Sequence, residues 1–492
     1  MARDLIERFW GAYLYVGCDA RTATWAVMSD PSGLLPVYWA EHGDGCLFAS
    51  DPALLGMCAR RVPGVSWSAV RAHLLRPELR QRQTCLEGIT ELIPGALLSV
   101  GAKDPPLRLW HAPDRALSSS QRTFEENAEE LRHIAAGVVG RWGKQLGYVA
   151  VASSGGVDSS LICGAGAIAG ISFGCVSLAT LDPSGDERVY ARAVAEACRV
   201  PFTERMYDPA LFDPAQAASA GLPRPGRRAF LSVLDAALGD AMAELGADVV
   251  LDGNGGDNIF CFLHSAAPVV DRLRAQGLRS GFTETLLDTC RITGCTISTM
   301  LGATARRLVA RTGDPWPADA TLLAVGAEPR HPDPLTAWLP EPGEARRGWQ
   351  DHMQLIMRSQ NQIHGTGTCL PRFSPLASQP IVEFCLSVPT WQWTRGGRNR
   401  ALARAAFSDV LPNEVLARTS KAGPDSLTRA AFARNRTAIS ERLMEGLLAK
   451  SGVIDRNAVL EALGCDPFHS ASPVRRLLDL LEAENWARSW HR

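Results

Sequence analysis

The segment from Val151 to Ser160 contains the first residues of the chain whose types and spacing suggest chemistry. It reads Val-Ala-Ser-Ser-Gly-Gly-Val-Asp-Ser-Ser, with a strand-like apolar run before it and a helix-like run after it. Gly155 and Gly156 permit a tight turn, after which backbone amides can face a phosphate at the positive end of a helix. Asp158 and Ser159 fall in the first helical turn, where a carboxylate beside phosphates makes sense mainly if a cation lies between them. No Walker lysine follows, and the same composition also occurs in ordinary linkers.

A second loop of similar composition follows a later apolar strand. It reads Leu-Asp-Gly-Asn-Gly-Gly-Asp-Asn from Leu251 to Asn258. Because ligands of an open parallel sheet lie beyond the carboxyl ends of its strands, we expect both loops at one edge of a sheet. Asp158 and Asp257 could then share one Mg²⁺. Taken alone, the second loop is an ordinary turn, and it lacks the spacing and the closing Glu of a calcium-binding EF-hand.

An α/β fold is expected to position these loops. From residue 148 onward apolar strands alternate with helices, which is the pattern of a parallel sheet with helical crossovers. The expected strands are 148–152, 173–178, 202–207 and 248–251, and the expected helices begin at 157, 186 and 229. Beyond about residue 265 the chain becomes helical and rich in Ala, Leu and Arg.

The amino-terminal part of the chain has a different pattern. Short β-rich segments are expected at 10–16, 24–28, 35–39, 46–49 and 96–100, separated by turns rich in Pro and Gly. At residues 112–121 the composition changes to Pro, Asp and Ser, and Thr123-Phe-Glu-Glu126 forms a capping box before the next helix. We therefore expect two domains, at 1–115 and 123–492.

The composition excludes several other kinds of protein. The 492 residues include 51 Lys and Arg against 52 Asp and Glu, which leaves no electrostatic footprint for nucleic acid or an anionic membrane. The uncharged stretch 159–181 contains glycines at 164, 166, 170 and 174, so a helix end followed by a strand is expected there instead of a membrane span. The 13 cysteines include no CxxC pair and the first residues lack a signal-peptide pattern, so a reducing cytoplasm is expected and structural zinc is not.

Together, the two loops resemble the ATP-pyrophosphatase motif of the asparagine synthetase family. That motif is Ser-Gly-Gly-x-Asp-Ser, followed downstream by Ser-Gly-x-Gly-x-Asp. Pro371–Leu376 is similar to the family's Arg-x-Pro-Phe-Leu-Asp segment, with one residue inserted and the terminal acid replaced. Arg400–Arg404, Leu411-Pro412 and Arg418–Lys421 resemble its C-terminal synthetase segment, so the resemblance covers most of the chain.

This resemblance implies a reaction and a set of site residues. In such enzymes a substrate carboxylate attacks the α-phosphate of ATP, giving an acyl-adenylate and pyrophosphate, and an amine then displaces AMP to form an amide. The positions that match pyrophosphate ligands are Ser154, Gly155, Gly156 and Ser159, those that match Mg²⁺ ligands are Asp158 and Asp257, and those that match nucleotide contacts are Ser153, Val176, Leu178, Asp252 and Gly253. Lys421 matches the lysine that stabilises charge on the phosphate and on the tetrahedral intermediate. The alternative is that Lys421 is one solvated lysine among others.

The amino-terminal region resembles only part of the family's glutaminase domain. Phe9–Asp19, Asp30–Tyr38 and Leu47–Asp51 look like its second half, so we expect a truncated, degenerate glutaminase-like domain. A glutaminase of this kind needs Cys directly after the initiator Met, and here that residue is Ala2. We therefore expect no glutamine hydrolysis, and the amine nucleophile should already be part of the substrate.

An amine on the substrate implies closure of an intramolecular amide, which two branches of the family perform. Lasso-peptide cyclases join a peptide's N-terminal amine to an Asp or Glu side chain, whereas β-lactam and carbapenam synthetases close a four-membered ring. The Gly-Gly-Asp-Asn-Ile-Phe run that ends at Phe260 resembles the cyclases, and Asn254 stands where the β-lactam branch uses Tyr. We expect a lasso-peptide cyclase. The alternatives are a β-lactam-type or asparagine-forming synthetase and a nucleotide-binding pseudoenzyme that acts as a scaffold.

A lasso-peptide cyclase implies ATP and Mg²⁺ as cofactors and a trimmed core peptide as substrate. The chain shows no separate leader-binding or protease module, so the expected partners are a leader peptidase and a leader-peptide-recognition protein. No nucleic acid and no membrane is expected as a partner. The sequence does not identify a general base: His264 and His364 are candidates, although a lone His more often has a structural role.

Overall fold

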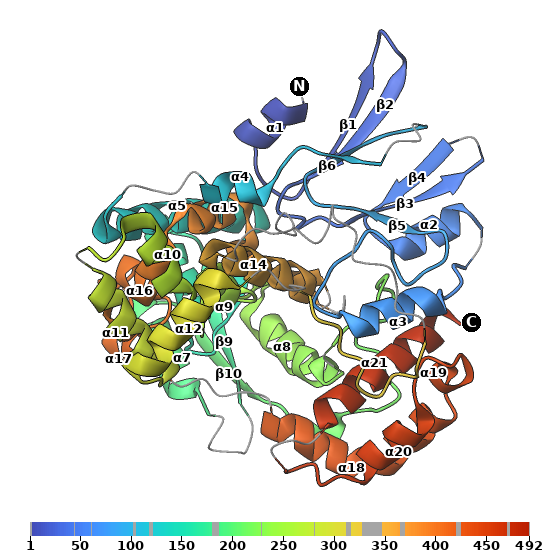
Figure 1. Ribbon diagram of the computed structural model, residues 1–492. Coiled ribbons are helices and arrows are strands. Elements are labelled where there is room, and N and C mark those ends of the chain that lie inside the picture. The colour runs from blue at the N-terminus through green and yellow to red at the C-terminus, as the bar shows by residue number, and fades with distance from the viewer. Residues whose placement is uncertain are drawn as a thin grey trace.

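The computed structural model shows a mixed α/β protein in which a β-rich amino-terminal region adjoins a parallel sheet surrounded by helices (Figure 1). The expected fold class is confirmed. The structure describes residues 2–43, 45–60, 62–101, 105–117, 122–179, 186–227, 229–279, 281–310, 316–326, 347–364, 370–419, 425–469 and 473–491.

Two antiparallel sheets form the amino-terminal region. The first contains, in spatial order, β1 (Leu14–Asp19), β2 (Thr24–Ser29), β6 (Ala96–Ser99) and β7 (Leu107–Arg108). The second contains β4 (Gly45–Ala49), β3 (Val37–His42) and β5 (Thr90–Leu92). Val27, Val37, Leu92 and Leu98 are buried together and join the two sheets. The helices of this region are α1 (Ala2–Arg8), α2 (Pro52–Cys58), α3 (Trp67–Leu75) and α4 (Ala112–Leu117).

A five-stranded parallel sheet lies at the centre of the remaining chain. Its spatial order is β10 (Phe202–Met206), β9 (Phe173–Ala179), β8 (Val149–Ala152), β11 (Val249–Leu251) and β12 (Arg372–Phe373). Four of these strands were expected from the sequence. The fifth, β12, was not, because a run of two paired residues is too short to show an alternating pattern. It pairs in parallel with β11, with Leu251 opposite Phe373.

Helices cover both faces of the parallel sheet. Val149 and Val151 pack toward α5 (Phe124–Leu146), α6 (Val157–Ala169) and α7 (Arg188–Cys198), whereas Ala150 packs toward α8 (Leu231–Leu245). Because successive side chains of a strand point to opposite faces, such strands are apolar throughout. The predicted capping box begins α5: the Thr123 hydroxyl accepts the Glu126 amide at 3.2 Å, and the Glu126 carboxylate accepts the Thr123 amide at 2.7 Å.

The other described residues after residue 265 are mainly helical, as expected. Between β11 and β12 the structure describes α9 (Gly256–Ile259), α10 (Ala267–Gln276), α11 (Phe282–Thr293), α12 (Ile297–Val309) and α14 (Gly348–His364). After β12 come α15 (Gln379–Ser387), α16 (Ala401–Ala406), α17 (Asn413–Ala417), α18 (Asp425–Met444), α19 (Leu447–Lys450), α20 (Arg456–Gly464) and α21 (Val474–Trp490). Residues 159–179 form most of α6 and then β9, as expected, and Gly170 ends α6 with a φ of 66°. Among the described helices none is long and apolar enough to cross a membrane.

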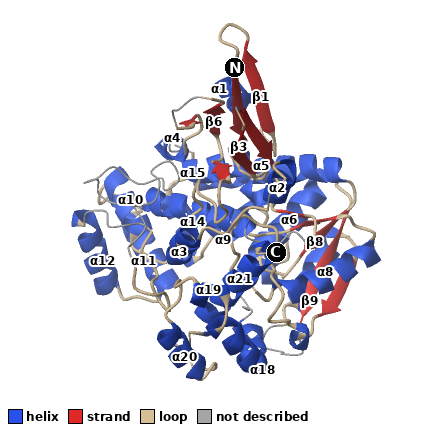
Figure 2. Cartoon of the chain, turned by 90° about the vertical axis from the view of Figure 1, so that its right-hand side faces the viewer, coloured by secondary structure: helices blue, strands red, loops and turns tan. Residues whose placement is uncertain are grey.

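The amino-terminal region packs closely against the other elements (Figure 2). Met28 and Trp110 belong to the same buried cluster as Trp142 of α5. Glu91 is 1% exposed. It forms ion pairs with Arg80, which also belongs to the amino-terminal region, and with Arg224, which lies in the loop before α8. The division into two domains at 1–115 and 123–492 stays a prediction. Two of the hydrophobic clusters contain residues from both of these parts of the chain.

Candidate active site

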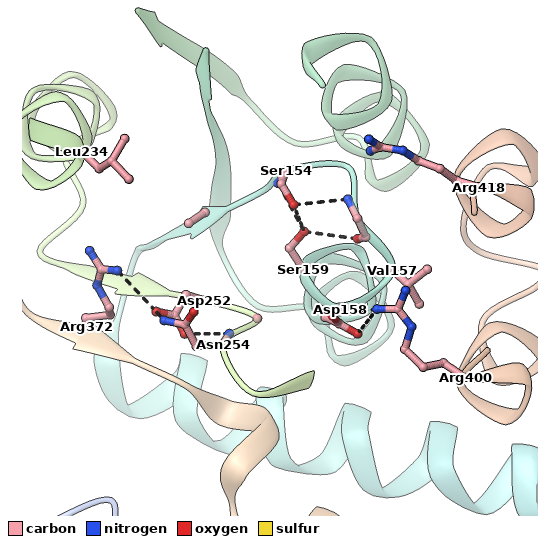
Figure 3. A pocket seen from close by; sticks show the side chains of 13 residues that line it. Ser154, Val157, Asp158, Ser159, Leu234, Asp252, Asn254, Arg372, Arg400 and Arg418 are labelled. Carbon is pink, nitrogen blue, oxygen red and sulfur yellow. Dashed lines mark hydrogen bonds and ion pairs between the residues drawn. The ribbon is translucent and has the colours of Figure 1, made fainter. Parts of the chain in front are cut away.

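A cavity of about 320 Å³ lies at the carboxyl edge of the parallel sheet (Figure 3). Its floor is formed by the two loops singled out in the sequence, which follow β8 and β11. The remaining lining comes from α8, β12 and two later segments, through Leu234, Arg372, Arg400 and Arg418. The expectation that both loops lie at one edge of a sheet is confirmed.

The first loop forms the amino-terminal end of α6. Gly155 has a φ of 61°, and a side chain there would collide with Tyr190 on α7, so the turn requires glycine. The Ser159 hydroxyl accepts the Ser154 amide at 3.3 Å and donates to the Gly156 carbonyl at 3.3 Å. These distances are at the long end of the hydrogen-bond range, so the hydroxyls can exchange these partners for phosphate oxygens. Helix α6 also directs its positive end toward the cavity.

The second loop packs backbone to backbone against the first. A Cβ added to Gly253 would lie 2.8 Å from the Ser159 amide nitrogen. A Cβ added to Gly256 would lie 2.5 Å from the Asp158 side chain. Both glycines are therefore required by contact between the loops, which only their three-dimensional pairing could reveal. This close approach leaves a cradle of backbone at the cavity floor.

Asp252 is held firmly in the cavity wall. One carboxylate oxygen accepts the Ser374 hydroxyl at 2.6 Å, and the other accepts the Asn254 side-chain amide at 2.7 Å. Arg372 lies 3.7 Å from that second oxygen and also pairs with Asp235 on α8. Burial raises the pKa of Asp235, while the Arg372 guanidinium opposes that shift.

Asp158 and Asp257 converge on one guanidinium nitrogen. Nη1 of Arg400 lies 3.1 and 2.9 Å from the two oxygens of Asp158 and also contacts Asp257. Asp158 is 6% exposed and Arg400 is 8% exposed. Arg400 has a φ of 53°, a conformation that non-glycine residues seldom adopt and that is frequent at functional sites. The two carboxylates are thus close enough to contact one nitrogen atom, and a shared Mg²⁺ would need the same closeness. No cluster of three potential metal ligands occurs in the described ranges.

The arginines of the cavity were not identified from the sequence. Arg418 donates to the Gly155 carbonyl at 3.4 Å, pairs with Glu187 and lies 4.4 Å from the centre of the Tyr190 ring. Together with Arg372 and Arg400 it places three guanidiniums around the cavity, which suits a polyphosphate. All three arginines lie in the segments that resemble the asparagine synthetase family, and this is the sequence feature that could have identified them.

Several predicted site residues lie beside the cavity or outside the described residues. Ser153 is buried beside the Cys163 thiol and does not line the cavity, so its contact with nucleotide stays a prediction. Val176 and Leu178 on β9 pack toward α8 and do not line the cavity, so their contact with nucleotide stays a prediction. Lys421 lies outside the described residues.

The two candidate bases remain without an assigned role. The ring of His264 is exposed and lies 4.5 Å from that of Phe262, centre to centre. Phe262 in turn lies 5.4 Å from the Arg400 guanidinium. His364 is the last residue of α14, and its side chain is outside the described part.

The comparison with protein families agrees with this geometry. The family model described as asparagine synthase matches residues 146–488, which include the parallel sheet, both loops and all three cavity arginines. The chain belongs to the asparagine synthase family. Membership in the asparagine synthase family supports an ATP-dependent amide-forming synthetase. A comparison with curated protein sequences finds no match.

The lining of the cavity in this asparagine synthase family protein suits the phosphates of a nucleoside triphosphate. Its volume is within the usual range of small-ligand sites. The glycine cradle and the end of α6 offer amides and hydroxyls, and the guanidiniums of Arg400 and Arg418 offer positive charge. ATP is therefore the expected cofactor of this site.

Proposed function

We propose that the protein is a lasso-peptide cyclase. It would activate an Asp or Glu side chain of a linear core peptide with ATP and close a macrolactam with the peptide's N-terminal amine. The observation that carries this proposal is the second loop, where Asn254 lines the cavity and binds Asp252. Its Gly-Gly-Asp-Asn continuation resembles lasso-peptide cyclases, and Asn254 replaces the Tyr of β-lactam-forming relatives.

The proposed reaction has two steps, activation of the carboxylate and formation of the amide. A carboxylate oxygen bonds to the α-phosphorus as the bond to pyrophosphate breaks, and the amine nitrogen then bonds to the acyl carbon as AMP leaves and the amine loses a proton. Ser154, Ser159 and the loop amides would hold the pyrophosphate oxygens, while Arg400 and Arg418 would offset their charge. Bound Mg²⁺, held by Asp158 and Asp257, would supply further charge neutralisation at the phosphates.

Lys421 would stabilise the negative charge that develops at the α-phosphate and on the tetrahedral intermediate. A preorganised cation is effective there because it needs no reorganisation as the charge forms. This role rests on the resemblance of Arg418–Lys421 to the family's synthetase segment.

We infer that the substrate itself carries the amine. Ala2 begins α1 and packs against the main hydrophobic core, and an alanine side chain cannot attack glutamine. An amine carried by the substrate itself would make ammonia unnecessary. We infer further that a leader peptidase and a leader-peptide-recognition protein deliver the trimmed peptide.

The proposal is tested with linear peptides that have a free N-terminal glycine and a single Asp or Glu at successive positions. Incubated with ATP and Mg²⁺, a substrate peptide should lose one water, with one AMP and one pyrophosphate formed for each closed ring. An N-acetylated peptide should still release pyrophosphate without ring closure. Asparagine formation from aspartate with ammonia or glutamine would contradict the proposal and favour a small-molecule amide synthetase. Nucleotide binding without turnover of any peptide or amino acid would favour a scaffold.

A further inference from the structure

A second cavity, of about 330 Å³, lies between the amino-terminal region and the parallel sheet. The amino-terminal wall is mostly apolar and carries one carboxylate; it is made by Leu34, Pro36, Tyr38, Ser50, Asp51 and Pro52. The opposite wall is made by the loop 221–223, by Ile363 and Leu370, and by β12 with Ser374. The amino-terminal region thus forms one side of this cavity.

The second cavity adjoins the nucleotide cavity at β12. Arg372 lines both cavities. Ser374 lines the second cavity and donates to Asp252, which lines the first, at 2.6 Å. β12 is an edge strand of the sheet, and Arg372 and Ser374 connect the two cavities there. A ligand in the second cavity would therefore lie beside the nucleotide cavity.

The charges around the second cavity favour a cationic ligand. Its lining carries two charged side chains, Arg372 and Asp51, and the Arg372 guanidinium is paired with Asp235, which does not line this cavity. Because Arg372 and Asp235 together carry no net charge, Asp51 sets the net charge of the lining. Asp51 lies on the amino-terminal wall. It accepts the Ala53 amide at 2.7 Å as the N-cap of α2, and its side chain is exposed.

We propose that the second cavity binds the amine-bearing arm of the substrate. Its ammonium group is attracted by Asp51, and its following side chains pack on the aliphatic wall. The amino-terminal region would then determine which amine the enzyme accepts. This inference rests on the proposed function, because the amine belongs to the same peptide.

Two substitutions test the second cavity without touching the nucleotide cavity. Ser50→Trp fills the cavity from an exposed position, and Asp51→Asn removes charge while keeping an efficient N-cap. Their matched controls are Thr22→Trp, at an exposed turn between β1 and β2, and Asp455→Asn, at the N-cap of α20. The probe is the set of linear free-amine peptides above, labelled with fluorescein at the carboxyl end. Binding is measured by anisotropy in the presence of a non-hydrolysable ATP analogue.

Ser50→Trp should weaken peptide binding about tenfold or more, since it introduces a direct clash. Asp51→Asn should weaken it about two- to fivefold, on the scale of an exposed ion pair. N-acetylated peptides should be insensitive to Asp51→Asn, and affinity for the ATP analogue should not change in any variant. Both controls should bind like the unmodified protein.

The outcomes separate this inference from the proposed function. If peptides are cyclised but all four variants bind them equally, the second cavity is not the amine site while the cyclase function stands. If peptides bind through Ser50 and Asp51 but lose no water, the cavity does bind the amine-bearing arm of a peptide, but the cyclase function is wrong. If the protein neither binds nor cyclises any free-amine peptide, both are wrong.

Discussion

Replacing Arg400 by Met removes the guanidinium that contacts both Asp158 and Asp257. Met keeps the apolar stem of Arg and lacks the guanidinium. The substitution leaves the carboxylates of Asp158, in the cavity lining, and Asp257 facing each other without the guanidinium between them. We expect it to destabilise the fold in the absence of ligands and to make the carboxylate pair a better site for a divalent cation.

The size of this effect depends on how deeply the three groups are buried. Removing one partner of a buried ion pair costs roughly 3–5 kcal/mol. Asp158 and Arg400 are buried, but the Asp257 side chain is 34% exposed, so water screens part of the interaction. We therefore expect the free energy of unfolding to fall by about 2–3 kcal/mol.

The assay is urea unfolding without nucleotide, with and without Mg²⁺. Mg²⁺ prefers carboxylate oxygens, so it should stabilise Arg400→Met more than the unmodified protein. At roughly ten times its dissociation constant the ion would contribute about 1.4 kcal/mol. Arg398→Met, two residues away and exposed, is the matched control and should change neither quantity.

Two results would refute this reasoning. One is an Arg400→Met protein as stable as the Arg398→Met control. The other is an Arg400→Met protein that Mg²⁺ stabilises no more than it stabilises the Arg398→Met control. This result would show that Asp158 and Asp257 do not form a site for a divalent cation. If Asp158 and Asp257 do not share an ion, the losses of activity in Asp158→Ala and Asp257→Ala should add in the double variant. If they do share one, the two losses should not add.

Further predictions concern the reaction, the domain contact, the loop packing and the response to pH. Lys421→Ala should slow amide formation at least roughly 100-fold, or about 3 kcal/mol, with a much smaller change in ATP binding by calorimetry; a normal rate would exclude Lys421 from the reaction. Glu91→Ala should lower the free energy of unfolding by about 3–5 kcal/mol in urea, because it removes the carboxylate that two buried guanidiniums contact; an unchanged midpoint would contradict that ion-pair cluster. Gly256→Ala should weaken ATP binding about tenfold or more, since its Cβ would lie 2.5 Å from the Asp158 side chain, whereas Gly137→Ala, with open space around its Cβ, should leave ATP binding intact. Burial lowers the pKa of His352 to about 4, so the unfolded chain binds a proton near pH 6.5 before the folded protein does; stability should fall by up to about 3 kcal/mol as pH drops from 6.5 to 4, and His352→Asn should reduce the slope of that fall by about one proton.

The sequence by itself determined the strands that precede the two loops, the helix that follows the first and the capping box at Thr123. Each depends on residues close together in the chain. A strand is recognised by a short apolar run, a turn by adjacent glycines, and a helix start by an N-cap residue and the Glu three positions later. The α/β class followed from their alternation, and with it the expectation that both loops meet at one sheet edge.

Only the tertiary structure decided which side chains surround the site. Arg372, Arg400 and Arg418 reach the cavity from segments far from Asp158 in the chain, and Val176 and Leu178 pack away from it toward α8. The second cavity likewise requires the amino-terminal region to pack across β12. These placements depend on long-range packing and on the side-chain directions of each element, and no local pattern of residues encodes them.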